Sequence, residues 1–233
     1  MAKLTFLHLY PETLKFNGER GNLLALKVRA EQYGHTVEIL TCELEEPVPN
    51  QPMSLIFLGS GTLSALRAAH RDLDLKRSKV LELVSAGSKV LAVGAGFDLI
   101  SNSIELTNGT LLSGLGLTKT NHRITGDHLV GEVAGENEIS GFINSDRLIQ
   151  REDHSTAVTT VTHSDEPKLI GYVDGYRDGV VMASNVQGPL LPMNPGLADE
   201  LIGWMTGTTP TGLPELDGLA AGARAAISVR VGN

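Results

Sequence analysis

A turn near the middle of the chain carries the strongest chemical signal in the sequence. The apolar run Val90–Val93 has the length of a buried strand, Gly94-Ala95-Gly96 follows it at once, and Phe97–Ile100 is able to open a helix. A strand that enters a helix through so tight a turn often displays a nucleophile, and the N–H group of the next residue then helps to hold a developing oxyanion. The tip of this turn is Gly94, which has no side chain. The sequence therefore predicts a nucleophile elbow without its nucleophile.

The same glycines allow a second interpretation, a dinucleotide-binding turn. In the fingerprint G-x-G-x-x-G the third glycine is replaced here by Leu99, and the strand is about the fourth of the chain, whereas the fingerprint belongs to the first. Two matching glycines are a weak signal, so an ordinary tight turn is favoured over a dinucleotide site.

Other nucleophiles near this turn are Ser60, Ser101 and Asp98, and the sequence shows no basic partner for any of them. The single cysteine, Cys42, lies at the end of the second predicted strand and is interpreted as a small hydrophobic residue near a sheet edge. An enzyme that uses one of the three nearby groups stays open as an alternative.

The cysteine and histidine residues do not indicate a metal or cofactor site. One cysteine excludes an internal disulfide framework and a cysteine-built zinc site. None of the seven histidines forms H-x-x-x-H or pairs with a glutamate at ligand spacing, so we expect no metal and no cofactor.

Arg123 is the strongest candidate for binding a substrate. It lies in a stretch rich in glycine and threonine, and a guanidinium can clamp a carboxylate through two parallel hydrogen bonds. The loop Gly59-Ser60-Gly61 follows another apolar strand, and together with the Ala95 N–H group it is expected to line the same crevice.

The elements that position these residues follow from apolar periodicity. Continuous apolar strands alternate with amphipathic helices in the first half of the chain, which predicts a mostly parallel sheet covered on both faces. Ligands bind at the carboxyl ends of such strands, so residues 59–61 and 94–96 should share one crevice. The predicted strands are 4–9, 36–40, 54–58 and 90–93, and the predicted helices are 22–33 and 62–85.

The second half of the chain has a different pattern. Short strand-like runs cover 129–133, 141–143, 157–161, 169–173 and 180–185, and Asn194-Pro195 caps a helix over 196–205. We therefore expect a single domain over 1–206. Residues 207–233 are read as a tail that forms a short helix near 216–226 or becomes ordered on a partner.

Charge and length exclude several classes of protein. The 233 residues carry 19 Lys and Arg against 27 Asp and Glu, a net charge of −8, which disfavours a nucleic-acid surface. The N-terminus lacks the pattern of a signal peptide, and no apolar run approaches the roughly 18 residues of a membrane helix. These features predict a cytoplasmic protein without a membrane span.

Several stretches resemble a known family in their residues and in their order along the chain. They are GERGNLLALKVRA from Gly18, IFLGSGT from Ile56, TKTNHRITGD from Thr118, Gly141-Phe142 with Asn144, and GPLLPMN from Gly188. With these motifs the chain resembles class I glutamine amidotransferases of the cobyric-acid-synthase-like (CobB/CobQ-like) branch. Within it, the resemblance is greatest to GatD-like amidotransferase subunits of lipid II isoglutaminyl synthase.

This resemblance implies a three-layer α/β/α fold with a central, mostly parallel sheet and a glutaminase site at its carboxyl edge. In the family a cysteine on the elbow attacks the glutamine amide, and a histidine activates this cysteine. The ammonia that is released passes to a synthetase. For the GatD-like branch that partner is a Mur-ligase-like, MurT-type subunit that acts in peptidoglycan amidation.

The chain departs from the family at both catalytic positions. Gly94 stands where the family has its cysteine, and Gln187 stands where it has its histidine. Loss of both predicts a natural pseudoenzyme that acts as a binding or regulatory subunit of the Mur-ligase-like partner and still binds glutamine or another small carboxylate. Two alternatives stay open, namely an active amidotransferase or hydrolase with non-standard residues, and a glutamine-binding sensor.

Overall fold

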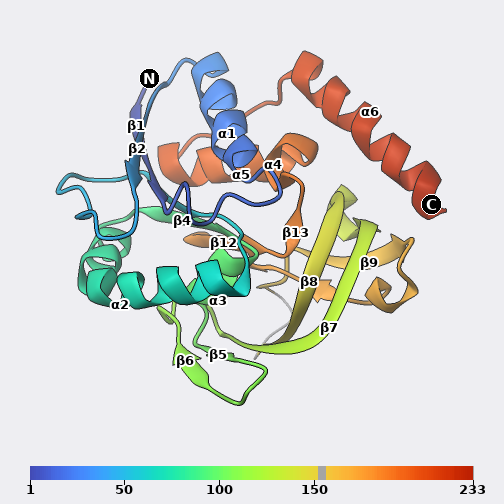
Figure 1. The fold of residues 1–233 in the computed structure, drawn as a ribbon. Coiled ribbons are helices and arrows are strands. Elements are labelled where there is room, and N and C mark those ends of the chain that lie inside the picture. Colours follow the sequence, from blue (N-terminus) through green and yellow to red (C-terminus); the bar gives the residue numbers. More distant parts are fainter. Residues whose placement is uncertain (152–155, 233) are drawn as a thin grey trace.

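The computed structural model describes residues 1–151 and 156–232, and its centre is a six-stranded sheet (Figure 1). Neighbouring strands run parallel except at one edge, where β11 is antiparallel to β12. The predicted parallel sheet is therefore confirmed. Its order is β11-β12-β4-β3-β1-β2, and its strands are β1 (Lys3–Leu9), β2 (Thr36–Cys42), β3 (Leu55–Leu58), β4 (Lys89–Val93), β11 (Tyr176–Arg177) and β12 (Val181–Ser184).

Helices cover both faces of this sheet, which explains why its central strands are apolar throughout (Figure 1). Alternate side chains point to opposite faces, so Ile56 and Val90 pack beneath α2, whereas Leu55 and Leu91 pack beneath α1 and α5. The result is the three-layer α/β/α arrangement expected from the sequence. The helices are α1 (Arg20–Gln32), α2 (Leu63–Ser85), α3 (Ala95–Ile100), α4 (Leu190–Met193) and α5 (Pro195–Thr206).

A second sheet lies beside the first, and sequence periodicity indicated only its fragments. Its main path is β10-β9-β7-β5-β6, and β8 pairs with both β7 and β13. The long β7–β8 hairpin is its dominant element (Figure 1). The strands are β5 (Ser103–Glu105), β6 (Leu111–Ser113), β7 (Thr120–Gly135), β8 (Ser140–Arg151), β9 (Thr159–Ser164), β10 (Val173–Asp174) and β13 (Val186–Gln187).

Two local predictions in this half are wrong. The strand expected over 169–173 is a 3-10 turn, Pro167–Leu169, followed by the two-residue β10, because Gly171 adopts a left-handed φ of 84° that interrupts an extended strand. For the stretch around Arg123, rich in glycine and threonine, the sequence predicts no strand. This stretch is the first part of β7, where alternate residues point to opposite faces.

The last segment forms α6 (Pro214–Val231), a helix longer than the predicted residues 216–226. Three arginines hold it against the rest of the chain. Arg29 pairs with Asp217 at 2.6 Å, Arg224 donates to the Met193 carbonyl at 2.7 Å, and Arg230 forms two hydrogen bonds with Glu132. Its end reaches the second sheet, where it contacts β7, β8 and β9 (Figure 1). Across the ranges described, no helix combines the length and apolarity needed to cross a membrane.

Candidate functional site

A cavity of about 260 Å³ opens at the carboxyl ends of β3, β4 and β12, and we call it the elbow cavity. The segment before α1 covers one side of it and β8 covers another. Carboxyl ends of parallel strands are where α/β sheets bind their ligands. The elbow cavity is lined by Phe16, Asn17, Ser60, Gly61, Thr62, Leu63, Gly94, Ala95, Ile124, His128, Asn144, Ser145, Asp146, Arg147, Asn185 and Gln187.

The turn at Gly94 joins β4 directly to α3 in a conformation that glycine adopts readily and other residues adopt only with strain. Gly94 has φ 55° and ψ −116°, a region that side-chain-bearing residues rarely adopt. Its N–H donates to the Ser184 carbonyl at 2.9 Å, and the Gly96 N–H donates to the Gly59 carbonyl at 2.8 Å. The tip is thereby fixed between β12 on one side and the end of β3 on the other, in the manner of a nucleophile elbow.

The space that a nucleophile would occupy at this tip is filled by other side chains. A Cβ atom placed on Gly94 would lie 2.3 Å from the Ser60 hydroxyl oxygen and 3.2 Å from Nε2 of Gln187. Both distances are too short for the neighbours to stay where they are. The elbow therefore combines the backbone of a catalytic turn with a closed tip.

Gln187 is fixed from three sides. Asn17 Nδ2 donates to its side-chain oxygen, its own Nε2 contacts the Asn144 carbonyl at 3.5 Å, and β13 pairs it with Phe142. The turn before it is held by the buried carboxylate of Asp174, which accepts hydrogen bonds from Ser184 and from the backbone N–H of residue 185. An amide in this position can donate and accept hydrogen bonds, but it cannot act as a base at neutral pH.

A buried charged network lies beneath the turn, and no pattern in the sequence indicates it. Asp98 in α3 is fully buried; one of its oxygens lies 2.8 Å from Nδ1 of His122, and the other accepts from Nε of Arg147 at 2.9 Å. His122 continues the chain of hydrogen bonds to Thr120 at 3.0 Å. Arg147 also pairs with Asp146, and it lines the elbow cavity. Asp98 thus orients a guanidinium into the cavity from below.

The electrostatics of the network follow from this geometry. Burial alone would raise the pKa of Asp98, but the charge of Arg147 and the contact with His122 outweigh it and hold that pKa below its ordinary value. Burial likewise works to lower the pKa of Arg147, and Asp98 and Asp146 raise it above its ordinary value. Asp98 is therefore ionised and Arg147 is charged at neutral pH.

Most of the site residues predicted from the sequence lie at or beside the elbow cavity, and Arg123 does not. Ser60, Gly61, Gly94, Ala95 and Gln187 meet at the elbow cavity. Gly59 lies just behind the cavity, and a Cβ there would come within 2.3 Å of the Leu14 carbonyl oxygen. Only glycine therefore lets this loop lie so close to the segment before α1.

Arg123 is not among the residues that line the cavity, and its side chain is exposed. Along β7 its neighbours His122 and Ile124 point inward, so alternation along the strand turns Arg123 away. The guanidinium in the cavity belongs to Arg147. Arg147 lies three residues after Asn144, outside the family-like stretches, and only the pairing of β7 with β8 relates it to the elbow.

The other nucleophile candidates lie outside the cavity. Ser101 is buried and donates to two backbone carbonyls, and the carboxylate of Asp98 is enclosed in its ion pairs. Cys42 is buried at the end of β2, where burial raises the pKa of its thiol. Within the described ranges, no group of three or more His, Cys, Asp or Glu side chains is arranged to hold a metal ion.

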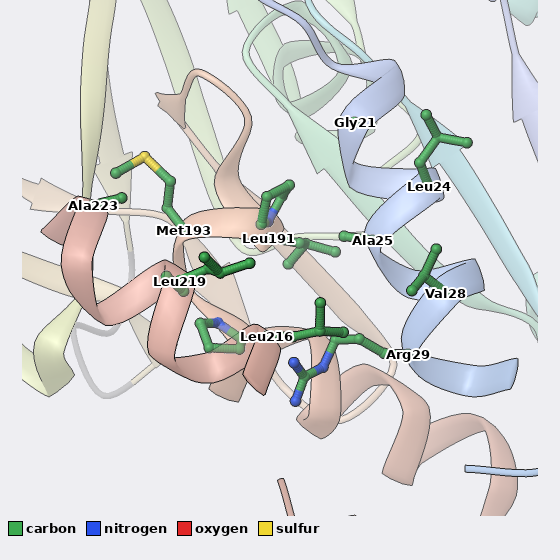
Figure 2. A pocket seen from close by; sticks show the side chains of 13 residues that line it. Gly21, Leu24, Ala25, Val28, Arg29, Leu191, Met193, Leu216, Leu219 and Ala223 are labelled. Carbon is green, nitrogen blue, oxygen red and sulfur yellow. The ribbon is translucent and has the colours of Figure 1, made fainter. Parts of the chain in front are cut away.

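A larger hollow of about 460 Å³ lies between α1, α4 and α6 and is almost wholly apolar (Figure 2). Leu24 and Val28 of α1 face Leu216 and Leu219 of α6 across it (Figure 2). Its one charged group, Arg29, is neutralised by Asp199 and Asp217. This hollow has no group suited to proton transfer or nucleophilic attack, so the elbow cavity is the candidate site despite its smaller volume.

The fold and the elbow together define a glutamine amidotransferase-like protein. Residues 5–195 match the CobB/CobQ-like glutamine amidotransferase domain. A crystal structure described as a glutamine amidotransferase superposes with a TM-score of 0.50 at 14% identity, covering 85% of this chain and 98% of that one. Because its identity is this low, that likeness concerns the fold alone.

Because the matched domain spans most of the sequence, the chain belongs to the CobB/CobQ-like glutamine amidotransferase family. It is similar to the GatD subunit of the glutamine-hydrolysing lipid II isoglutaminyl synthase of Streptococcus pneumoniae, with 25% identity across 86% of this chain and 79% of the relative. The GatD subunit from Staphylococcus aureus is 26% identical across 87% of this chain and 84% of the relative. The family resemblance in the sequence is confirmed.

Proposed function

We propose that this chain is a GatD-like protein without glutaminase activity that binds glutamine or another small carboxylate. In this proposal it serves as a binding or regulatory subunit of a Mur-ligase-like, MurT-type synthetase in peptidoglycan amidation. One observation carries the proposal. The tip of the elbow is Gly94, and Ser60 and Gln187 fill the space in which an attacking side chain would stand.

The chemistry of amide hydrolysis supports this reading. A covalent mechanism needs a thiolate or an activated hydroxyl together with a base, and removing such a pair from a hydrolase costs several orders of magnitude in rate. Gly94 offers no attacking atom, and the Gln187 amide cannot take up a proton. The remaining groups of the cavity are suited to binding, because Arg147 lines it beside several amide side chains. Asp98 and Asp146 occupy its Nε and Nη1, and its Nη2 forms no hydrogen bond with a described residue.

Arg147 supplies the first test. Replacing it with lysine keeps one positive charge but removes Nη2, the guanidinium nitrogen that neither Asp98 nor Asp146 occupies. The affinity for glutamine measured by isothermal titration calorimetry should therefore fall about tenfold or more. Arg123→Lys is the matched control, and its affinity should equal that of the parent. Equal affinities for the parent and Arg147→Lys, or a loss confined to Arg123→Lys, would assign the carboxylate to a different site. Circular dichroism must show both variants to be folded.

The proposed partner should contact the mouth of the elbow cavity. In the family, ammonia passes from the amidotransferase to the synthetase, so the cavity mouth and the subunit interface must adjoin. Phe16 lies at this mouth with half of its side chain exposed, and buried aromatic anchors often dominate protein interfaces.

Phe16→Glu should therefore weaken binding to a co-expressed Mur-ligase-like subunit about 30-fold or more, measured by surface plasmon resonance. The matched control is Leu75→Glu, since Leu75 is 86% exposed on α2 and belongs to no lining of the elbow cavity. Equal affinity for the parent and Phe16→Glu would exclude contact at this mouth. Failure of the parent to bind would remove the partner from the proposal and leave the ligand-binding part standing.

One observation favours a second candidate, a hydrolase that uses Ser60. Of the three nucleophiles considered, Ser60 alone lines the cavity, and its oxygen stands at the closed tip of the elbow. Its hydroxyl forms no hydrogen bond with a described residue that could act as its base, which disfavours this reading. If turnover is found, Ser60→Ala decides, because it abolishes a serine-dependent reaction and leaves any other unchanged.

A further inference from the structure

A separate cavity of about 250 Å³ lies between α2 and the β5–β6 hairpin, and we call it the α2 cavity. Helix α2 contributes Arg67, His70 and Arg71, and the hairpin contributes polar groups at its tip and leucines at its base. It shares no lining residue with the elbow cavity. Leu63, one turn before Arg67 on the same helix, lines the elbow cavity, so the two hollows lie on adjacent parts of α2.

Two arginines in the α2 cavity lack counter-charges. Arg67 and Arg71 are one helical turn apart, both are exposed, and neither forms an ion pair with a described residue. By contrast, Arg77, further along the same helix, pairs with Asp74 at 3.2 Å. Like charges one turn apart destabilise a helix unless an anion lies between them. In a chain of net charge −8, this places two uncompensated guanidinium groups at one hollow.

Two hairpin side chains of the cavity can donate hydrogen bonds, whereas Nε2 of His70 already lies 3.0 Å from the Ser113 carbonyl. The Asn108 side-chain oxygen already accepts from the Thr110 N–H at 3.1 Å, and its Nδ2 makes no hydrogen bond to a described residue. The Thr110 hydroxyl adds a further donor, and no carboxylate lines the cavity. Its base is apolar, with Leu106 buried beneath the hairpin tip. Donors and positive charges above an apolar base suit an oxyanion attached to an organic group.

We propose that the α2 cavity binds the phosphate group of an organic ligand. A carboxylate carries one charge and is satisfied by one guanidinium fork, whereas two forks at one hollow match the double charge and three oxygens of a phosphate monoester. The apolar base accepts the carbon atoms next to the phosphate. The same monoester chemistry is presented by a soluble organic phosphate and by the headgroup of phosphatidic acid, and the experiment separates the two sources.

The test uses the full chain and three probes, namely inorganic phosphate, phenyl phosphate, and vesicles of phosphatidylcholine with or without phosphatidic acid. Calorimetry should show saturable binding of phenyl phosphate that is tighter than that of inorganic phosphate and weaker at high salt. The double variant Arg67→Gln/Arg71→Gln should bind about 100-fold more weakly, roughly tenfold for each lost charged hydrogen-bonding group. Arg20→Gln is the matched control, because Arg20 is exposed, forms no ion pair with a described residue, and lies outside this cavity.

Each outcome supports or overturns the proposal. Binding of phenyl phosphate that depends on the two arginines identifies a soluble ligand. Co-sedimentation with phosphatidic acid vesicles alone, lost in the double variant and kept in Arg20→Gln, identifies a lipid headgroup. Absence of binding in every arm, or equal binding by the parent and the double variant, overturns it. None of these results depends on Gly94, so the proposal stands or falls separately from the proposed function.

Discussion

Replacing Asp98 with asparagine should lower the free energy of unfolding by about 3–5 kcal/mol at neutral pH, the cost of breaking a buried ion pair by removing one partner. The substitution keeps the volume of the side chain and removes its charge. Arg147 then loses the carboxylate at 2.9 Å that fixes it, and His122 loses the partner of its Nδ1. Denaturation in urea, monitored by circular dichroism, gives the difference as a shift of the midpoint with an unchanged slope.

A matched exposed pair provides the control. Asp74→Asn removes the partner of Arg77 at a site where the Asp74 side chain is 62% exposed, so the loss should stay below about 1 kcal/mol. If the two variants lose the same stability, the Asp98 network does not support the elbow.

The pH dependence of the same difference has a definite sign. Because the folded protein holds the pKa of Asp98 below its ordinary value, the stabilisation is fully present at neutral pH. It is lost as the pH falls below the ordinary carboxyl value of about 4 and through the depressed one. The stability gap between the parent and Asp98→Asn should therefore shrink in acid. A gap that is constant from pH 7 down to pH 3 would contradict this assignment.

Restoring glutaminase chemistry should take three substitutions. Gly94→Cys and Gln187→His together place a thiol and an imidazole at the two positions to which the family resemblance assigns the catalytic pair. The new Cβ, however, lies 2.3 Å from the oxygen and 2.8 Å from the Cβ of Ser60. Rotation of the hydroxyl relieves the first contact but not the second. We expect the double variant to stay inactive and the triple variant with Ser60→Gly to release ammonia from glutamine, at least about tenfold above background.

The single variants and Ser60→Gly in the parent are the controls, and each should be inactive, because each lacks the thiol at the elbow, its base or both. Glutamate dehydrogenase coupling measures the ammonia. Activity in the double variant equal to that in the triple variant would mean that Ser60 does not close the elbow. Absence of activity in a triple variant with parental melting temperature would mean that the cavity no longer positions glutamine for attack.

The central sheet could be predicted from the sequence because its signals are local. Apolar runs of strand length, such as Leu55–Leu58, alternate with helical periodicity, and β1–β4 fall within one or two residues of the predicted bounds. The second sheet could not be predicted as such, since its order depends on pairings between distant strands. The 16 residues of β7 contain a register shift between Ile124 and Leu129, which hides their alternation from a reader of the sequence.

The candidate site, like the fold, could be predicted only where its signals are local in the sequence. Gly94 is visible because a strand, two glycines and a helix follow one another within a few residues. Arg147 is 49 residues from Asp98, and only the folding of the β7–β8 hairpin onto α3 brings the two into contact. In the sequence, Arg123 is as good a candidate for carboxylate binding as Arg147. Strand alternation alone decides which of the two guanidinium groups reaches the cavity. The closed tip at Ser60 is likewise a matter of packing.

The most direct test of the account is a glutaminase assay on the unmodified protein. Purified chain, alone and with a co-expressed Mur-ligase-like subunit, is incubated with glutamine, and ammonia is followed by glutamate dehydrogenase coupling. The account predicts no release above the buffer background in either sample, because Gly94 presents no attacking atom. Turnover at a rate ordinary for an enzyme, on the order of 1 per second or more, would contradict it.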